Sequence, residues 1–128
     1  MKPRTLALVA VFGLLAQAAY AQDPAAGEKI FVQCKACHQV GPGAKNLTGP
    51  NLNGLFGRKS GSVEGARYSA ANKTWGQTWT EEVFRTYIQN PRETIPGTTM
   101  AFAGLRDAQK ISDLIAYLKQ FGADGKTP

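Results

Sequence analysis

The pentapeptide Cys34-Lys35-Ala36-Cys37-His38 constrains this 128-residue chain more than any other feature of its sequence. Both cysteines of the chain and its only histidine lie within these five positions. One histidine and two cysteines are too few to complete a four-ligand zinc site from Cys and His alone. A Ser-His-Asp triad would have to use the same histidine. We therefore expect the chemistry of the chain to centre on the pentapeptide.

The C-x-x-C-H spacing is typical of covalent c-type haem attachment. Cys34 and Cys37 are about one helical turn apart, so both sulfurs can reach the two vinyl groups on one porphyrin edge. His38 is then placed to bind the iron from one face. Two alternatives stay open, a structural disulfide and a thioredoxin-like redox pair. Neither needs His38, and the redox pair needs a βαβ context that the sequence does not show.

A second iron ligand has to come from outside the pentapeptide. Met100 is the only methionine besides Met1, and it follows the Pro96-Gly97 turn. A thioether is a neutral, soft ligand that favours ferrous iron and raises the potential of a His-ligated haem. The alternative is a methionine that fills a gap in the core. Because Met100 lies in a loop and not on a helix face, we expect it to bind iron.

Residues 1–21 have the pattern of a cleaved secretory signal peptide. A basic head precedes an apolar run over 6–16 and an Ala-x-Ala site that ends at Ala21. The run is too short to span a bilayer, so we expect no stable membrane insertion. Residues 22–128 are expected to form one domain in the periplasm, and their length excludes a large two-domain enzyme. Loss of two basic residues with the signal lowers the net charge from +6 to +4.

The rest of the chain predicts an all-α domain with two long loops. Apolar residues at helical spacing and N-cap residues predict helices that begin after Asp23, Thr80 and Asp107, and a short helix over 69–73. The polar tail 123–128 is expected to fray. The loops over 41–65 and 92–106 are too long for a compact domain of this size, so a large apolar group must complete the core.

Six further motifs extend over nearly the whole of residues 22–128. They are Thr48-Gly49-Pro50-Asn51-Leu52, Gly54-Leu55-Phe56-Gly57-Arg58-Lys59, Ala71-Asn72-Lys73, Asn90-Pro91, Ile95-Pro96-Gly97-Thr98 and Asp113-Leu114-Ile115-Ala116-Tyr117-Leu118. With the pentapeptide and Met100 they resemble the class I cytochromes c, nearest to mitochondrial cytochrome c and the bacterial cytochromes c2. The resemblance implies the class I cytochrome c fold, with about four to five helices and long loops wrapped around one covalently bound haem c.

The resemblance also implies roles for residues around the haem. The Pro50 carbonyl would accept a hydrogen bond from the ring of His38 and orient this ligand. The other residues that would contact the haem are Arg58, Tyr68 and Trp79 at a propionate, Tyr87 and Thr98 beside Met100, and Asn72 in a nearby polar network. Gly27 and Phe31 would meet the last helix where the terminal helices cross. Trp75 is given no role.

The implied function is a soluble, periplasmic one-electron carrier that is a monomer and not an enzyme. Its expected partners, reached by transient docking, are a cytochrome bc1 complex, a photosynthetic reaction centre, a terminal oxidase or a periplasmic dehydrogenase, and nucleic acid is not among them. Gln33, Glu93 and Thr99 stand where the family often has partner-docking lysines. Two alternatives remain: a haem-based sensor or enzyme with an open sixth iron position, and a disulfide oxidoreductase that uses the two cysteines.

The C-x-x-C-H pattern predicts haem that cannot be extracted. Protein produced in a host that matures c-type cytochromes should carry one haem through acid–organic extraction, because two thioether bonds to Cys34 and Cys37 would hold it. Intact-mass spectrometry of the extracted polypeptide measures this. An extractable haem, or an intact disulfide between the two cysteines, would contradict the prediction.

Overall fold

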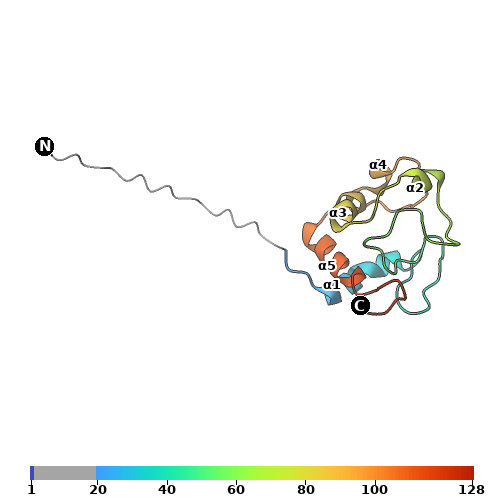
Figure 1. Ribbon diagram of the computed structural model, residues 1–128, viewed down its shortest axis with the longest axis horizontal. Helices are drawn as coiled ribbons and strands as arrows, with labels where there is room; N and C mark the ends of the chain where they lie inside the picture. The colour runs from blue at the N-terminus through green and yellow to red at the C-terminus, as the bar shows by residue number, and fades with distance from the viewer. Residues whose placement is uncertain (2–19) are drawn as a thin grey trace.

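The computed structural model describes Met1 and residues 20–128, and the regular structure of this part is helical (Figure 1). The expected signal peptide falls mainly on residues 2–19, which lie outside the described part, so it stays a prediction. The elements are α1 (Pro24–Phe31), the 3-10 turn η1 (Val32–Cys34), α2 (Ala70–Thr74), α3 (Glu81–Gln89), α4 (Pro91–Thr94) and α5 (Ala108–Leu118). None of the described helices is long and apolar enough to cross a membrane. The all-α fold with four to five helices is confirmed.

The longer helices begin where the sequence predicts, because polar side chains cap their first turns. The Asp23 carboxylate accepts the N–H groups of Ala25 and Ala26, and Pro24 occupies the first helical position. Thr80 caps α3 in the same way.

Helix α4 is not among the predicted elements, since the sequence analysis places loop from residue 92 onward. It forms because the Asn90 side chain accepts the N–H of Glu93, while Pro91 supplies a helical φ at the first position. One capped turn of this kind carries no apolar stripe that periodicity could reveal. The turn begins the segment that leads to Met100.

The first and last helices cross in close contact, as Figure 1 shows for α1 and α5. Gly27 is buried at the crossing, and a Cβ built there would lie 1.9 Å from the carbonyl oxygen of Asp113. The rings of Phe31 and Tyr117 pack with their centroids 5.4 Å apart. The backbones therefore approach so closely that only glycine fits. This confirms the expected meeting of Gly27 and Phe31 with the last helix.

The C-terminal tail is ordered, which contradicts the expectation that it frays. Gly125 is buried, and the N–H of Gly122 donates to the carbonyl of Lys126. Polar composition predicts an exposed end, but this tail is fixed by backbone hydrogen bonds that composition cannot show.

Gly27→Ala should destabilise the folded protein strongly, because the new methyl group would overlap the α5 backbone. We expect a loss of roughly 1–3 kcal/mol or more in the free energy of unfolding. Denaturant titration followed by circular dichroism measures it, with exposed Glu28→Ala on the same helix as the control. Equal stability of the two variants would contradict the close crossing.

Candidate functional site

A cavity of about 240 Å³ lies between the helices and the long loops. Apolar side chains of the core form most of its wall, including Phe31, Leu55 and Leu114. Every residue that the sequence analysis names as cofactor-binding lines this one cavity. They are Cys34, Cys37, His38, Pro50, Arg58, Tyr68, Asn72, Trp79, Tyr87, Thr98 and Met100. The fold thus brings these residues together from the pentapeptide, from four of the six further motifs and from positions outside these motifs.

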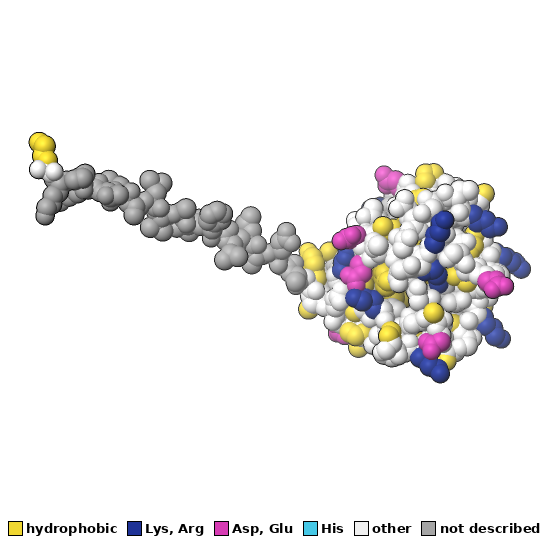
Figure 2. Space-filling view, in the orientation of Figure 1, with side chains coloured by type: hydrophobic (Ala, Val, Ile, Leu, Met, Phe, Trp, Pro, Cys, Tyr) yellow, Lys and Arg dark blue, Asp and Glu magenta, His cyan; other side chains and the backbone are white. Residues whose placement is uncertain are grey.

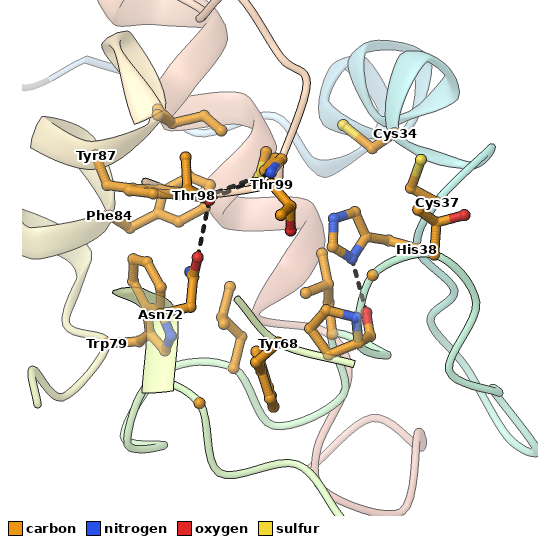
Figure 3. A pocket seen from close by; sticks show the side chains of 18 of the residues that line it. Cys34, Cys37, His38, Tyr68, Asn72, Trp79, Phe84, Tyr87, Thr98 and Thr99 are labelled. Atoms are coloured by element: carbon orange, nitrogen blue, oxygen red, sulfur yellow. Dashed lines mark hydrogen bonds between the residues drawn. The ribbon is translucent and has the colours of Figure 1, made fainter. Parts of the chain in front are cut away.

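Cys34, Cys37 and His38 of the pentapeptide form one wall of the cavity (Figure 3). The N–H groups of Cys37 and His38 donate to the carbonyl of Cys34 at 3.1 and 2.9 Å, so the three residues form one tight turn. Figure 3 shows both sulfurs and the imidazole near one another along this wall. The one-turn spacing expected from the sequence is therefore present.

Both cysteines are free thiols and partly buried. Burial, with a smaller contribution from the neighbouring Cys37, raises the pKa of Cys34 to about 11. A redox-active thiol pair needs a lowered pKa so that the thiolate forms at neutral pH. The environment of Cys34 does the opposite, which disfavours the disulfide oxidoreductase alternative.

One nitrogen of the His38 ring is hydrogen bonded to the backbone, and the other can bind a metal ion. Its Nδ1 lies 2.7 Å from the carbonyl oxygen of Pro50, and since a carbonyl only accepts, Nδ1 carries the proton. Burial lowers the pKa of His38, an effect opposed by the Pro50 hydrogen bond and increased by the charge of Arg58. Gly49 packs against the ring, where a Cβ would come within 2.4 Å of Cε1. The neutral ring therefore keeps the Nε2 lone pair for a metal ion.

A second polar cluster surrounds the thioether of Met100. The hydroxyl of Tyr87 donates to the Met100 sulfur at 2.9 Å. Burial raises the pKa of Tyr87 to about 12, so the hydroxyl keeps its proton at neutral pH. The Thr98 hydroxyl donates to the Oδ1 of Asn72 at 2.8 Å, as the dashed line in Figure 3 shows. In that view Tyr87, Thr98 and Asn72 lie across the cavity from the pentapeptide.

A partly buried cation completes the lining. Arg58 donates to the backbone carbonyls of Asn51 and Asn53, at 3.1 and 3.0 Å. Within residues 20–128 no carboxylate forms a salt bridge with it, since the one ion pair there joins Lys119 and Glu81. A buried cation without an anionic partner is costly, so its position suits a ligand that brings a negative charge.

These observations fit haem. Two thiols in one turn can form thioethers, an imidazole Nε2 and a thioether Sδ are donors of the kinds that ligate haem iron, and Arg58 can face a propionate. The apolar wall suits the porphyrin face. The chemistry of the lining therefore meets each need of a covalently bound haem.

One aromatic residue that the sequence analysis leaves without a role supports this wall. Trp75 packs on Trp79 with ring centroids 5.3 Å apart, and on Tyr87 at 6.2 Å. Trp79 and Tyr87 meet edge to face at 4.9 Å. Trp75 therefore backs two cavity residues from outside. The available signal was its size, because a large aromatic side chain is buried to a high degree on average.

Comparison with known proteins agrees with the geometry. The family model "Cytochrome c" matches residues 24–122. The chain is 63% identical to the cytochrome c2 of Blastochloris viridis, over 90% of this chain and 94% of that protein. It is 54% identical to the cytochrome c-554 of Methylosinus trichosporium, over 95% and 93% of the two chains.

Two solved structures are also similar. Cytochrome cH from Methylobacterium extorquens superposes with a TM-score of 0.71 at 42% identity, over 77% of this chain and 98% of that one. Cytochrome c2 from Rhodospirillum centenum superposes with a TM-score of 0.74 at 40% identity, over 78% and 98%. Family model, relatives and cavity agree, and the chain belongs to the cytochrome c family.

Proposed function

We propose that this chain is a periplasmic electron carrier whose haem is attached to Cys34 and Cys37 and ligated by His38 and Met100. The observation that carries the proposal is the cavity, which gathers a free imidazole nitrogen, a thioether and two adjacent thiols from distant parts of the chain. Bound haem supplies the one-electron chemistry of its iron. Relatives named cytochrome c2 and cytochrome c-550 support the carrier function.

The chain's own residues set the conditions for electron transfer. The Pro50 carbonyl polarises the His38 ring and makes Nε2 a better donor to iron. The Tyr87 hydroxyl draws electron density from the Met100 sulfur and so weakens its donation to the oxidised iron. The hydrogen bond to His38 therefore lowers the reduction potential, whereas the hydrogen bond to Met100 raises it.

The same geometry argues against the two alternative functions. A sensor or an enzyme would need an open iron position, whereas the Met100 sulfur lies in the cavity and is oriented by Tyr87. A disulfide oxidoreductase would need an activated thiol, whereas burial deactivates Cys34. We therefore propose a carrier without an enzymatic activity of its own. Residues 1–21 would direct it to the periplasm.

Partner docking would use a weak positive field. Lys35, Lys45, Lys73 and Arg92 are exposed, but Glu93 lies directly beside the last of them. Figure 2 shows basic and acidic side chains interspersed on the visible face, without one continuous basic patch. The proposed partners are membrane-bound or periplasmic redox proteins that meet the carrier only transiently.

Met100→Ala tests the proposed ligation. Loss of the thioether should lower the reduction potential by on the order of a few hundred millivolts, because axial ligands set haem potentials over about 0.8 V. It should also open the iron to cyanide and carbon monoxide. Redox titration and ligand-binding spectra measure both effects, with Thr99→Ala on the same loop as the control. A potential and spectrum equal to those of the control would show that Met100 is not a ligand.

Tyr87→Phe removes only the hydroxyl that points at the Met100 sulfur. The thioether should then donate more strongly to oxidised iron, so the potential should fall. A neutral hydrogen bond contributes about 0.5–1.5 kcal/mol, which for one electron corresponds to roughly 20–60 mV. Tyr117→Phe is the matched control, because Tyr117 is buried but does not line the cavity. An equal potential for both variants would contradict the assignment.

The rate of electron transfer to an acidic partner should fall as ionic strength rises, because salt screens attraction beyond about 8 Å at physiological concentration. Since acidic residues interrupt the basic face, the slope should be shallow compared with a strongly lysine-ringed cytochrome. Stopped-flow kinetics across a salt series gives the slope. A rate that increases with salt would show that the docking face is not positive.

A further inference from the structure

The C-terminal tail, residues 121–128, closes into a small loop of its own after α5. The N–H of Gly122 donates to the carbonyl of Lys126, and the N–H of Gly125 donates back to the carbonyl of Gly122, both at 2.8 Å. The Asp124 carboxylate accepts the N–H of Lys126 at 2.9 Å. The tail is therefore a formed element with a defined inner side.

That inner side lies against the loop over residues 39–54, which we call the histidine loop. At one end of the loop, the N–H of Gly54 donates to the carbonyl of Phe121 at 2.9 Å. At the other, buried Gly125 has a φ of +77° and approaches Gly41, so that a Cβ on Gly125 would lie 2.2 Å from the Gly41 oxygen. The tail thus contacts the histidine loop near both of its ends.

A buried side chain joins those two ends to each other. The Asn53 amide accepts the N–H of Gly41 at 2.8 Å and donates to the carbonyl of the same residue at 2.9 Å. Next to this pair, the N–H of Leu52 donates to the carbonyl of Gln39. The base of the histidine loop is therefore closed by three hydrogen bonds and covered by the tail.

The closed loop holds Pro50, whose carbonyl oxygen lies 2.7 Å from the Nδ1 of His38. We propose that the C-terminal tail is a positioning element for His38: by fixing the base of the histidine loop, it holds the Pro50 carbonyl against the imidazole. The inference rests on the proposed function in that it takes His38 as an iron ligand. Loosening the tail should lengthen the hydrogen bond, weaken donation from Nε2 and raise the reduction potential.

Gly125→Ala tests this, because its methyl group would push the tail away from Gly41. Gly43→Ala is a matched control in the same histidine loop. Gly43 has a similar φ of +73°, so it suffers the same backbone strain, but its added Cβ would meet nothing within 4 Å. Any difference between the two variants therefore reports on the contact between tail and loop.

The measurements use the haem-loaded mature protein in its reduced state. In Gly125→Ala, NMR should show exchange of the His38 Nδ1 proton and the Gly41 amide proton faster by about tenfold or more, while amides within α5 keep their protection. The potential should rise in this variant and stay at the wild-type value in Gly43→Ala. Equal exchange and equal potentials in the two variants would overturn the proposal, as would faster exchange throughout α5, which reports general destabilisation.

Asp124→Ala provides a milder change if Gly125→Ala fails to load haem. It removes the acceptor for the Lys126 N–H without adding atoms to the contact, and the same two protons should exchange faster, by a smaller factor. Unchanged exchange there would overturn the proposal. The absorption spectrum of the wild-type protein tests the proposed function separately. If that spectrum lacks the features of His/Met ligation, the proposed function is wrong, whatever the tail variants show.

Discussion

The central cavity is the constraint on which the rest of the structure depends. The loops over 41–65 and 95–106 have no apolar stripe of their own, and they meet around a space lined by core residues. Because protein interiors are close-packed, such a space has to be filled for the fold to be stable. A haem attached covalently to the pentapeptide would fill this space permanently. It would complete the apolar core, as additional helices do in a protein without a cofactor.

Backbone carbonyl groups orient two of the residues that line this cavity. His38 is held by the carbonyl of Pro50 and Arg58 by the carbonyls of Asn51 and Asn53. These acceptors do not titrate, so their orientation of the imidazole and the guanidinium is independent of pH over the physiological range. The positions of these acceptors depend on the conformation of the loops that carry them, and these loops are fixed by hydrogen bonds of their own.

Much of the fold and the site could be predicted from particular residues. Asp23, Thr80 and Asp107 fix helix starts through local hydrogen bonds, so short-range sequence is sufficient for them. The spacing of the two cysteines and the histidine in the pentapeptide predicts that all three lie on one turn. The ordered tail and the packing of Trp75 were not predicted because they depend on contacts between segments that are distant in the sequence. Helix α4 was missed for another reason: it is a single turn with a local cap, too short to show an apolar stripe.

The crossing of α1 and α5 joins segments from opposite ends of the chain, so its formation depends on the order in which they become available. Asp23 and Asp113, which share a hydrogen bond at this crossing, are 90 residues apart in the sequence. A polypeptide that emerges from a translocation channel with its N-terminus first exposes α1 long before α5 is released. The crossing therefore cannot form until nearly the whole chain has been released. The cavity is thus completed only when the last helix, which contributes Leu114 and Leu118 to its wall, is in place.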